Sequence, residues 1–201
     1  MEENIFLKIY KIIPYTKAEG PGARFCIWVQ GCSKHCTGCF AKETWDKNKG
    51  KNISVNEIFN EICKNKDKIE GVTFLGGEPF EQAFALSFLA KRVQELGLSV
   101  LTFSGLTYEE LKNKKDESID SLLEYTDLLI DGGYQKENFD ISRPWVGSSN
   151  QRYIFLTDRY NEDVIAKFKN KIEVRINKKG VVFVNGMGNF DELAKKMSAF
   201  Y

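Results

Sequence analysis

Three cysteines crowded into one short segment are the residues of this 201-residue chain best suited to do chemistry. Cys32, Cys36 and Cys39 lie in the sequence GCSKHCTGC and have the spacing C-x3-C-x2-C. Three thiolates from one tight loop can converge on one metal centre, and they leave its fourth position without a cysteine ligand. Structural zinc normally has four protein ligands, whereas a [4Fe-4S] cluster that is held by three cysteines keeps one iron free for another molecule. The spacing therefore favours an iron–sulfur centre with one open position.

The single histidine leaves a second interpretation of the cysteine loop open, in which the loop binds zinc. His35 lies inside the loop and could complete a structural zinc site, although its adjacency to Cys36 would strain the coordination of one ion. Without such a role, His35 is a solvated loop residue. Cys26 and Cys63 are interpreted as small apolar residues of a strand and a helix. The odd number of five cysteines, and their crowding, suits metal coordination in a reducing compartment better than a disulfide framework.

A second segment, Gly76-Gly77-Glu78-Pro79, has the composition of a ligand-binding turn. It follows the short apolar run GVTFL, which predicts a buried strand. Two glycines at a strand end let the backbone approach a ligand closely, and the proline restricts the turn that follows. An ordinary strand-to-helix turn, with Glu78 favoured by the helix dipole, explains the segment equally well when it is taken alone. Together with the cysteine loop, ligand binding is the preferred interpretation.

Apolar periodicity predicts the elements that must position these two segments. Ser54 followed by Glu57 is a capping-box signal for a helix that runs to about Asn65. Further helices are predicted over 80–96, 107–114 and 121–127, and strands over 5–13, 24–30, 71–75, 98–103, 128–131 and 151–156. The alternation of strands and helices predicts βα units and a mostly parallel sheet. After Asn161 the pattern changes to a short helix, a hairpin (IEVRI, NKKG, VVFVN) and a last short helix from about Asp191.

Polar residues at the predicted strand ends are further candidates for the site. Ser104, Asp131 and Arg152 lie at or beside strand ends, where a parallel barrel gathers its active site. Each also has an ordinary alternative, which is turn capping for Ser104 and a salt bridge for Asp131 and Arg152. Asn150, within GSSNQR, could bond a cofactor or a partner backbone, or simply form a turn.

Composition excludes several classes of protein. Hydrophobic residues make up 42% and charged residues 28% of the chain, which is typical of a soluble globular protein. A net charge of +1 supplies no electrostatic reason to expect a nucleic-acid partner. No apolar run is long enough to span a membrane, and the N-terminus lacks a signal peptide, so a cytoplasmic location is expected. With no repeat or linker, we expect one domain over 1–201, with a core at about 20–160 and an appendage at about 161–201.

The motifs taken in order resemble a known family. GPGARFCIWVQGCSKHCTGCFAKETW, FLGGEP, LLIDG and RPWVGSSNQR, which together span about 20–156, are similar to segments of the radical S-adenosylmethionine (radical SAM) superfamily. Within it, they most resemble the activating enzymes of anaerobic ribonucleotide reductase and, less closely, of pyruvate formate-lyase. The resemblance implies an α/β fold, a partial and open TIM-type barrel of about six parallel strands with outer helices. A complete barrel needs about 250 residues, and the C-terminal hairpin and short helix are additions to the barrel.

The resemblance also implies a set of residues around the cofactors, a [4Fe-4S] cluster and S-adenosylmethionine (SAM). The three loop cysteines would hold the cluster, the GGEP segment would bond the methionine ammonium, and Trp45 would pack the loop onto the barrel. Ser104 and Asp131 would contact the ribose or methionine portion, and Arg152 would pair with the SAM carboxylate. Phe40 would pack on adenine or shield the cluster, unless it is a core residue. The complete expected set is Cys32, Cys36, Gly38, Cys39, Phe40, Gly76, Gly77, Glu78, Pro79, Ser104, Asp131, Asn150 and Arg152.

The function implied by the resemblance is radical chemistry on a partner protein. The unique iron would bind SAM, and reductive cleavage would produce methionine and a 5′-deoxyadenosyl radical. This radical would take a hydrogen atom from one glycine of a glycyl-radical enzyme such as anaerobic ribonucleotide reductase, with reduced flavodoxin or ferredoxin as electron donor. A radical SAM enzyme that modifies a ribosomal peptide or a small molecule is the first alternative. A non-catalytic zinc or iron–sulfur interaction module is the second.

Overall fold

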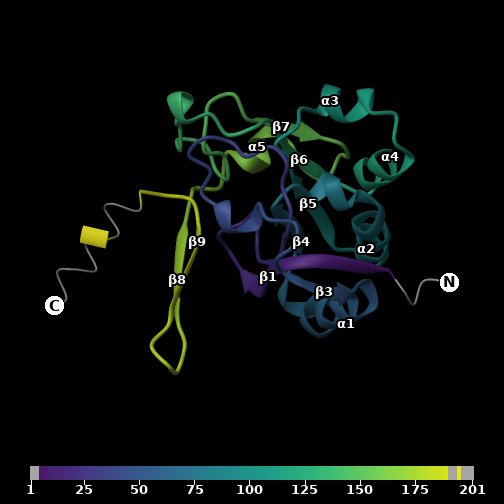
Figure 1. Ribbon diagram of the computed structural model, residues 1–201, viewed down its shortest axis with the longest axis horizontal. Helices are drawn as coiled ribbons and strands as arrows, with labels where there is room; N and C mark the ends of the chain where they lie inside the picture. The colour runs from purple at the N-terminus through teal and green to yellow at the C-terminus, as the bar shows by residue number, and fades with distance from the viewer. Residues whose placement is uncertain (1–4, 190–193, 196–201) are drawn as a thin grey trace.

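A seven-stranded sheet forms the centre of the protein (Figure 1). The computed structural model describes residues 5–189 together with 194 and 195. The strands run in the order β3-β1-β2-β4-β5-β6-β7, so the sheet is open, with β3 and β7 as its edges. The bounds are β1 (Phe6–Thr16), β2 (Arg24–Val29), β3 (Lys51–Ser54), β4 (Gly71–Gly76), β5 (Ser99–Phe103), β6 (Leu128–Asp131) and β7 (Arg152–Phe155). The predicted α/β class and the open barrel are confirmed.

Four of these strands form a parallel core, fewer than the six or so that were expected. β2, β4, β5 and β6 pair in parallel, while β1 and β3 at one edge and β7 at the other pair antiparallel with their neighbours. A parallel neighbour needs a crossover connection, usually a helix. The segment 132–151 between β6 and β7 contains only the short 3-10 helix Lys136–Asn138. The chain therefore returns along β6 in the opposite direction.

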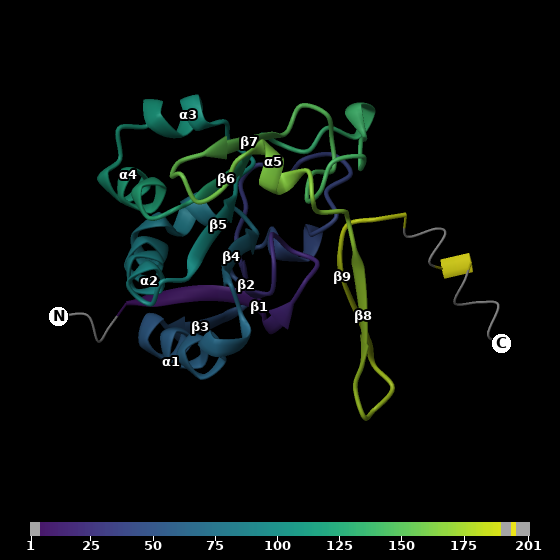
Figure 2. The same cartoon turned by 180° about the vertical axis from the view of Figure 1, so that it is seen from behind.

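Helices cover one side of the sheet and bury the main core (Figure 2). These helices are α1 (Val55–Asn65), α2 (Ala83–Glu95), α3 (Tyr108–Asn113) and α4 (Glu117–Glu124), whereas the short α5 (Glu162–Ile165) packs through Ile165 in a separate cluster with Leu101 and Ile130. The predicted capping box is present, because Ser54 Oγ accepts from the backbone N–H of Glu57 and the Glu57 carboxylate accepts from that of Ser54. The helix expected from residue 80 begins at Ala83, after a 3-10 turn that starts at Pro79. Burying side chains such as Leu86 stabilises this layer by roughly 1.5–3 kcal/mol each.

The predicted C-terminal hairpin is present as a separate two-stranded sheet, β8 (Ile172–Ile176) and β9 (Val182–Gly186). It lies beside the body of the protein, on the side away from α1 and α2 (Figures 1 and 2). Most of the short helix predicted from Asp191 lies outside the described residues. In the described part of the chain, every helix is too short or too polar to cross a lipid bilayer.

Candidate active site

The cysteine loop leaves the carboxyl end of β2, as the sequence predicts. Its base is closed by two backbone hydrogen bonds, from Gly31 N–H to the Thr44 carbonyl at 2.7 Å and from Cys32 N–H to the Trp45 carbonyl at 3.2 Å. Gly31 has a φ of +101°, which a residue with a side chain rarely adopts. The loop therefore starts and ends at one point of the sheet and projects as a unit.

All three loop cysteines line one cavity of about 720 Å³. Each is half-buried, and burial raises the pKa of the Cys32 thiol. Over residues 5–189, 194 and 195, no three His, Cys, Asp or Glu side chains meet closely enough to hold a single metal ion. A four-iron cluster does not need that convergence, since each cysteine binds a different iron. Three partly accessible thiols at one cavity fit such a cluster, whereas Cys26 is fully buried in β2 and Cys63 lies on α1.

The GGEP segment packs directly against the base of the cysteine loop. Gly77 N–H donates to the Val29 carbonyl at 2.8 Å, and a Cβ added to Gly77 would lie 2.1 Å from the Gly31 carbonyl oxygen. Gly76 has a φ of +104°, and its added Cβ would lie 2.7 Å from Trp28 Cα. The two glycines are thus required by contact between two backbone segments. The two interpretations of the sequence, the approach of a ligand and an ordinary strand-to-helix turn, do not include this contact with the cysteine loop.

Glu78 is a buried carboxylate at this junction, and it lines the cavity. It accepts hydrogen bonds from Ser104 Oγ at 3.0 Å, from Gly105 N–H at 2.8 Å and from Phe80 N–H at 3.1 Å. Burial raises the pKa of Glu78 to about 7 even though these three donors lower it. A cationic group that entered the cavity would favour the ionised form, so the site is suited to a ligand ammonium.

The raised pKa of Glu78 predicts how the stability of the cofactor-free protein depends on pH. An unfolded chain ionises this carboxyl near a pKa of 4.5, whereas the folded chain holds the proton up to about pH 7. Between these values the native state binds more protons, so the free energy of unfolding falls as the pH rises. We expect the free energy of unfolding of the wild type to fall by about 3 kcal/mol more than that of Glu78→Gln between pH 4.5 and 8, measured by urea unfolding. A variant with the wild-type pH profile would contradict the raised pKa.

Asp131 and Arg152 form the salt bridge that was their alternative interpretation. The Asp131 carboxylate is fully buried and accepts from Arg152 Nε at 3.0 Å and Nη2 at 2.6 Å, and from Tyr108 N–H at 2.7 Å. Arg152 also pairs with Glu109 at 2.6 Å, and its side chain is 44% exposed. Neither Asp131 nor Arg152 lines the cavity. Their contact with SAM stays a prediction.

A double-mutant cycle measures what this pair contributes to stability. Removing the guanidinium leaves the buried Asp131 carboxylate with the Tyr108 N–H as its remaining donor among the described residues. We expect Arg152→Gln and Asp131→Asn to show a coupling free energy of about 1–2 kcal/mol in urea unfolding, between the values of exposed and buried ion pairs. Glu109→Gln is the control and should have a smaller effect, because Glu109 is exposed. A coupling free energy near zero would show that the ion pair does not contribute to the stability of the fold.

The other predicted residues divide between the cavity and its surroundings. Gly38 and Phe40 line the cavity, and Phe40 is 72% exposed, so it is not a core residue. Pro79 is buried at the start of a 3-10 turn. Asn150 Nδ2 donates to the Gly133 carbonyl at 2.8 Å, while its buried Oδ1 has no hydrogen-bond partner among the described residues. Asn150 does not itself line the cavity, so its contact with a cofactor or a partner backbone stays a prediction.

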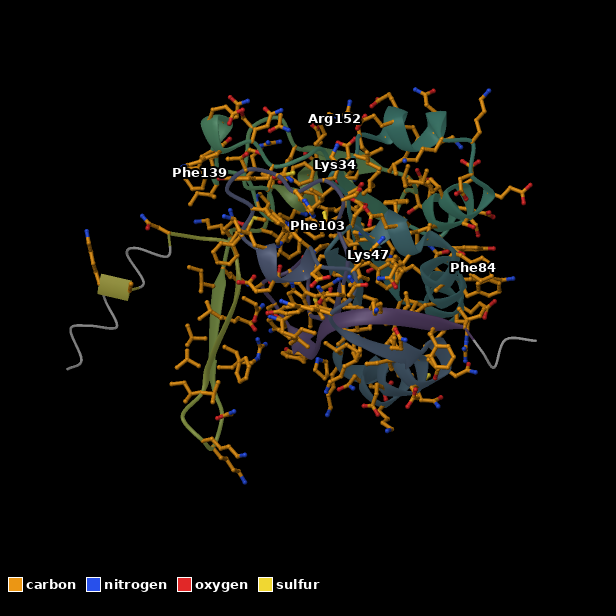
Figure 3. The ribbon with its side chains drawn as sticks, in the orientation of Figure 1. Lys34, Lys47, Phe84, Phe103, Phe139 and Arg152 are labelled. Atoms are coloured by element: carbon orange, nitrogen blue, oxygen red, sulfur yellow. The ribbon has the colours of Figure 1, made fainter. Side chains whose placement is uncertain are left out.

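Several residues of the cavity were not identified from the sequence. Lys34 of the cysteine loop and Phe103 at the end of β5 both line it (Figure 3). His35 is exposed, as expected, but its ring stacks on Trp45 with centroids 4.6 Å apart. This contact joins the middle of the loop to the Trp45 side chain at its end, whereas the packing of the loop onto the barrel by Trp45 stays a prediction. The sequence held one indication that Phe103 belongs to the site, which is its position directly before Ser104.

Comparison with known proteins places this site in a family. Residues 18–154 match the family described as "4Fe-4S single cluster domain". The anaerobic ribonucleoside-triphosphate reductase-activating protein of Enterobacteria phage T4 is 31% identical over 156 residues, which cover 74% of this chain and 94% of that protein. The protein of the same name from Escherichia coli K12 is 28% identical over 72% of this chain and 96% of its own length.

A further relative covers more of the chain. Pyruvate formate-lyase 1-activating enzyme of Escherichia coli K12 is 29% identical over 188 residues, 90% of this chain and 70% of that enzyme. The expected resemblance is therefore confirmed. The chain belongs to the 4Fe-4S single cluster family and, within it, to the anaerobic ribonucleoside-triphosphate reductase-activating proteins, radical SAM enzymes whose cofactors are a [4Fe-4S] cluster and S-adenosylmethionine.

Proposed function

We propose that this protein activates an anaerobic ribonucleoside-triphosphate reductase by taking a hydrogen atom from one glycine of that enzyme. The observation that carries the proposal is a single cavity lined by the three loop cysteines together with Glu78 and Ser104. The names of the relatives supply the candidate partner. A glycyl-radical enzyme of the pyruvate formate-lyase type is a less similar candidate of the same class.

The residues of the cavity have distinct tasks in this proposal. Cys32, Cys36 and Cys39 hold the cluster and leave one position for SAM. When bound, the reduced cluster and SAM supply a 5′-deoxyadenosyl radical, which is reactive enough to abstract a hydrogen atom from a glycine α-carbon. The Glu78 carboxylate receives the ammonium group of SAM, and the hydrogen bonds from Ser104 and Gly105 hold it in place.

The cavity has apolar residues both in its interior and at its exposed rim. Trp28, Leu75 and Phe103 contribute apolar surface to the interior. Tyr10 and Phe139 line the same cavity but are largely exposed, so they form an apolar rim. Exposed apolar groups at the mouth of a cavity are typical of a surface that contacts another protein. A glycine loop of the partner enters there in this proposal.

The whole chain acts as one radical SAM domain in this proposal, with the hairpin as an appendage of its core. Glu173 and Asn185 of the hairpin bond Thr16 and Glu19 next to the barrel, which supports a single unit. Reduced flavodoxin or ferredoxin is proposed as the electron donor on the grounds of the resemblance alone.

The decisive experiment uses the anaerobically reconstituted enzyme, dithionite, SAM and the anaerobic ribonucleoside-triphosphate reductase of the same organism. We expect release of 5′-deoxyadenosine and a carbon-centred doublet in the electron paramagnetic resonance spectrum of the reductase. Release without that doublet would contradict the proposed partner and favour a peptide or small-molecule substrate. No release at all from a protein with a loaded cluster would contradict the proposed reaction.

A further inference from the structure

The C-terminal hairpin carries an apolar face that the rest of the chain leaves largely exposed. In its register, Val174 pairs with Val184 and Ile176 pairs with Val182, so these four side chains share one face. Ile176 is 66% exposed and Val182 is 44% exposed. An isolated two-stranded hairpin is marginally stable in water, and exposed apolar surface of this kind marks an interaction site.

The base of the hairpin is held firmly to the body of the protein. The Glu173 carboxylate accepts from Thr16 Oγ1 at 2.8 Å and from Lys17 N–H at 2.6 Å. Asn185 Nδ2 donates to Glu19 Oε1 at 3.1 Å. A Cβ added to Gly186 would lie 2.8 Å from Ala18 Cβ, so the two segments are in close contact. The base is therefore placed by the fold, while the turn at 177–180 projects away from it (Figure 1).

The same hairpin forms one wall of the cavity that holds the cysteines. Val184 and Asn185, followed by residues 186–188, line that cavity together with the cysteine loop. The apolar face thus begins at the cavity wall with Val184 and continues outward through Val182 and Ile176. A chain segment that lay along this face would reach the cavity without leaving the surface of the protein.

The charge of the hairpin region indicates which kind of partner would bind to the apolar face. Whereas the whole chain has a net charge of +1, residues 167–189 contain a single acidic residue, Glu173. The basic residues of this stretch are Lys167, Lys169, Lys171, Arg175, Lys178 and Lys179. A second copy of this chain would bring an equally basic hairpin, and like charges oppose that pairing. An acidic partner is favoured instead.

We infer that the hairpin is a docking arm for the protein substrate. An extended substrate segment with acidic and apolar side chains lies along Val174, Ile176 and Val182, with its acidic groups near Lys178 and Lys179. This contact delivers the adjoining glycine loop to the cavity. The inference rests on the proposed function, since the substrate segment belongs to the glycyl-radical enzyme.

Two double variants of the arm test the inference in the complete, cluster-loaded enzyme. Lys178→Glu/Lys179→Glu reverses the charge of the turn, and Ile176→Ser/Val182→Ser removes apolar surface. Lys66→Glu/Lys68→Glu, at exposed positions after α1, is the control with the same change in net charge. Phe84→Ser is the control for exposed apolar surface, since Phe84 on α2 is 57% exposed and lies on the far side of the molecule from the hairpin (Figure 3).

The measured quantity is the KM for the anaerobic ribonucleoside-triphosphate reductase in glycyl-radical formation. We expect each arm variant to raise this KM about tenfold, the charge variant also to reduce its dependence on salt, and both controls to stay within about twofold of wild type. Release of 5′-deoxyadenosine in the absence of reductase should be the same in all five proteins, because none of the substituted residues lines the cavity.

The outcomes separate the inference from the proposed function. If wild type forms the glycyl radical and the arm variants match the controls in KM, the docking arm is wrong and the proposed function stands. If wild type releases 5′-deoxyadenosine but never forms the radical on the reductase, both are overturned. If light scattering shows a wild-type dimer that Ile176→Ser/Val182→Ser dissociates without raising KM, a second copy covers the face and the inference is overturned.

Discussion

Replacing Cys36 with alanine is expected to abolish the release of 5′-deoxyadenosine, whereas Cys63→Ala is expected to leave it within about twofold of wild type. Cys36 lies in the loop that lines the cavity, and losing one of three thiolates removes a ligand that no neighbouring cysteine replaces. Cys63 lies on α1, outside the cavity lining. Both substitutions replace a cysteine with alanine and so remove one thiol. They differ only in where that thiol lies in the fold.

The measurement combines product release with iron content after anaerobic reconstitution. Cys36→Ala should lose the visible absorbance of the cluster together with at least about 100-fold of the activity, while Cys63→Ala should keep both. Equal losses from the two changes would count against the assignment of the loop cysteines. Normal activity in Cys36→Ala would remove the basis of the radical SAM chemistry.

Replacing Gly77 with alanine should be nearly as damaging, although the change adds only one methyl group. That methyl would lie 2.1 Å from the Gly31 carbonyl oxygen, a distance at which the two backbone segments must separate. Glu78 and the cysteine loop would then shift relative to each other, because Glu78 N–H also donates to that carbonyl, at 2.8 Å. We expect about a 100-fold loss in 5′-deoxyadenosine release, the size of effect that a displacement of about 1 Å can have in an active site.

Gly97→Ala is the matched control for this substitution. Gly97 has a φ of +78°, so alanine is strained there by about 1–2 kcal/mol, but nothing lies within 4 Å of the added Cβ. Gly97 follows α2 and does not line the cavity, so this variant should lose stability while keeping activity at temperatures where it is folded. If Gly77→Ala behaves like Gly97→Ala, the contact between GGEP and the cysteine loop has no role in the chemistry.

The family and the cofactors could be identified from the sequence because their signals are local. The three cysteines lie within eight positions, and GGEP is contiguous, so both motifs are recognisable without knowledge of the fold. The capping box of Ser54 and Glu57 and the hairpin around NKKG are local in the same way, and the structure contains both. Hydrogen bonds between residues three apart depend little on the rest of the chain.

The direction of the outer strands was less predictable. Apolar runs identify β1 and β7 as strands. Periodicity does not tell which strand lies next to each of them in the sheet, or whether the two strands run parallel or antiparallel. The length and composition of the connections decide that, and the segment before β7 has no α-helix to make a parallel crossover. For this reason the number of parallel strands was overestimated.

By itself, the sequence determined the chemical groups of this protein: the thiols, the carboxylate of Glu78 and the alternating elements that carry them. Only the tertiary structure decided which groups face one another. Gly77 meets Gly31, Asp131 meets Arg152, and the hairpin closes one wall of the cavity through Asn185, although these partners are far apart in the chain. Such contacts depend on the relative placement of strands, which is set by packing of the whole core and not by any short stretch of residues.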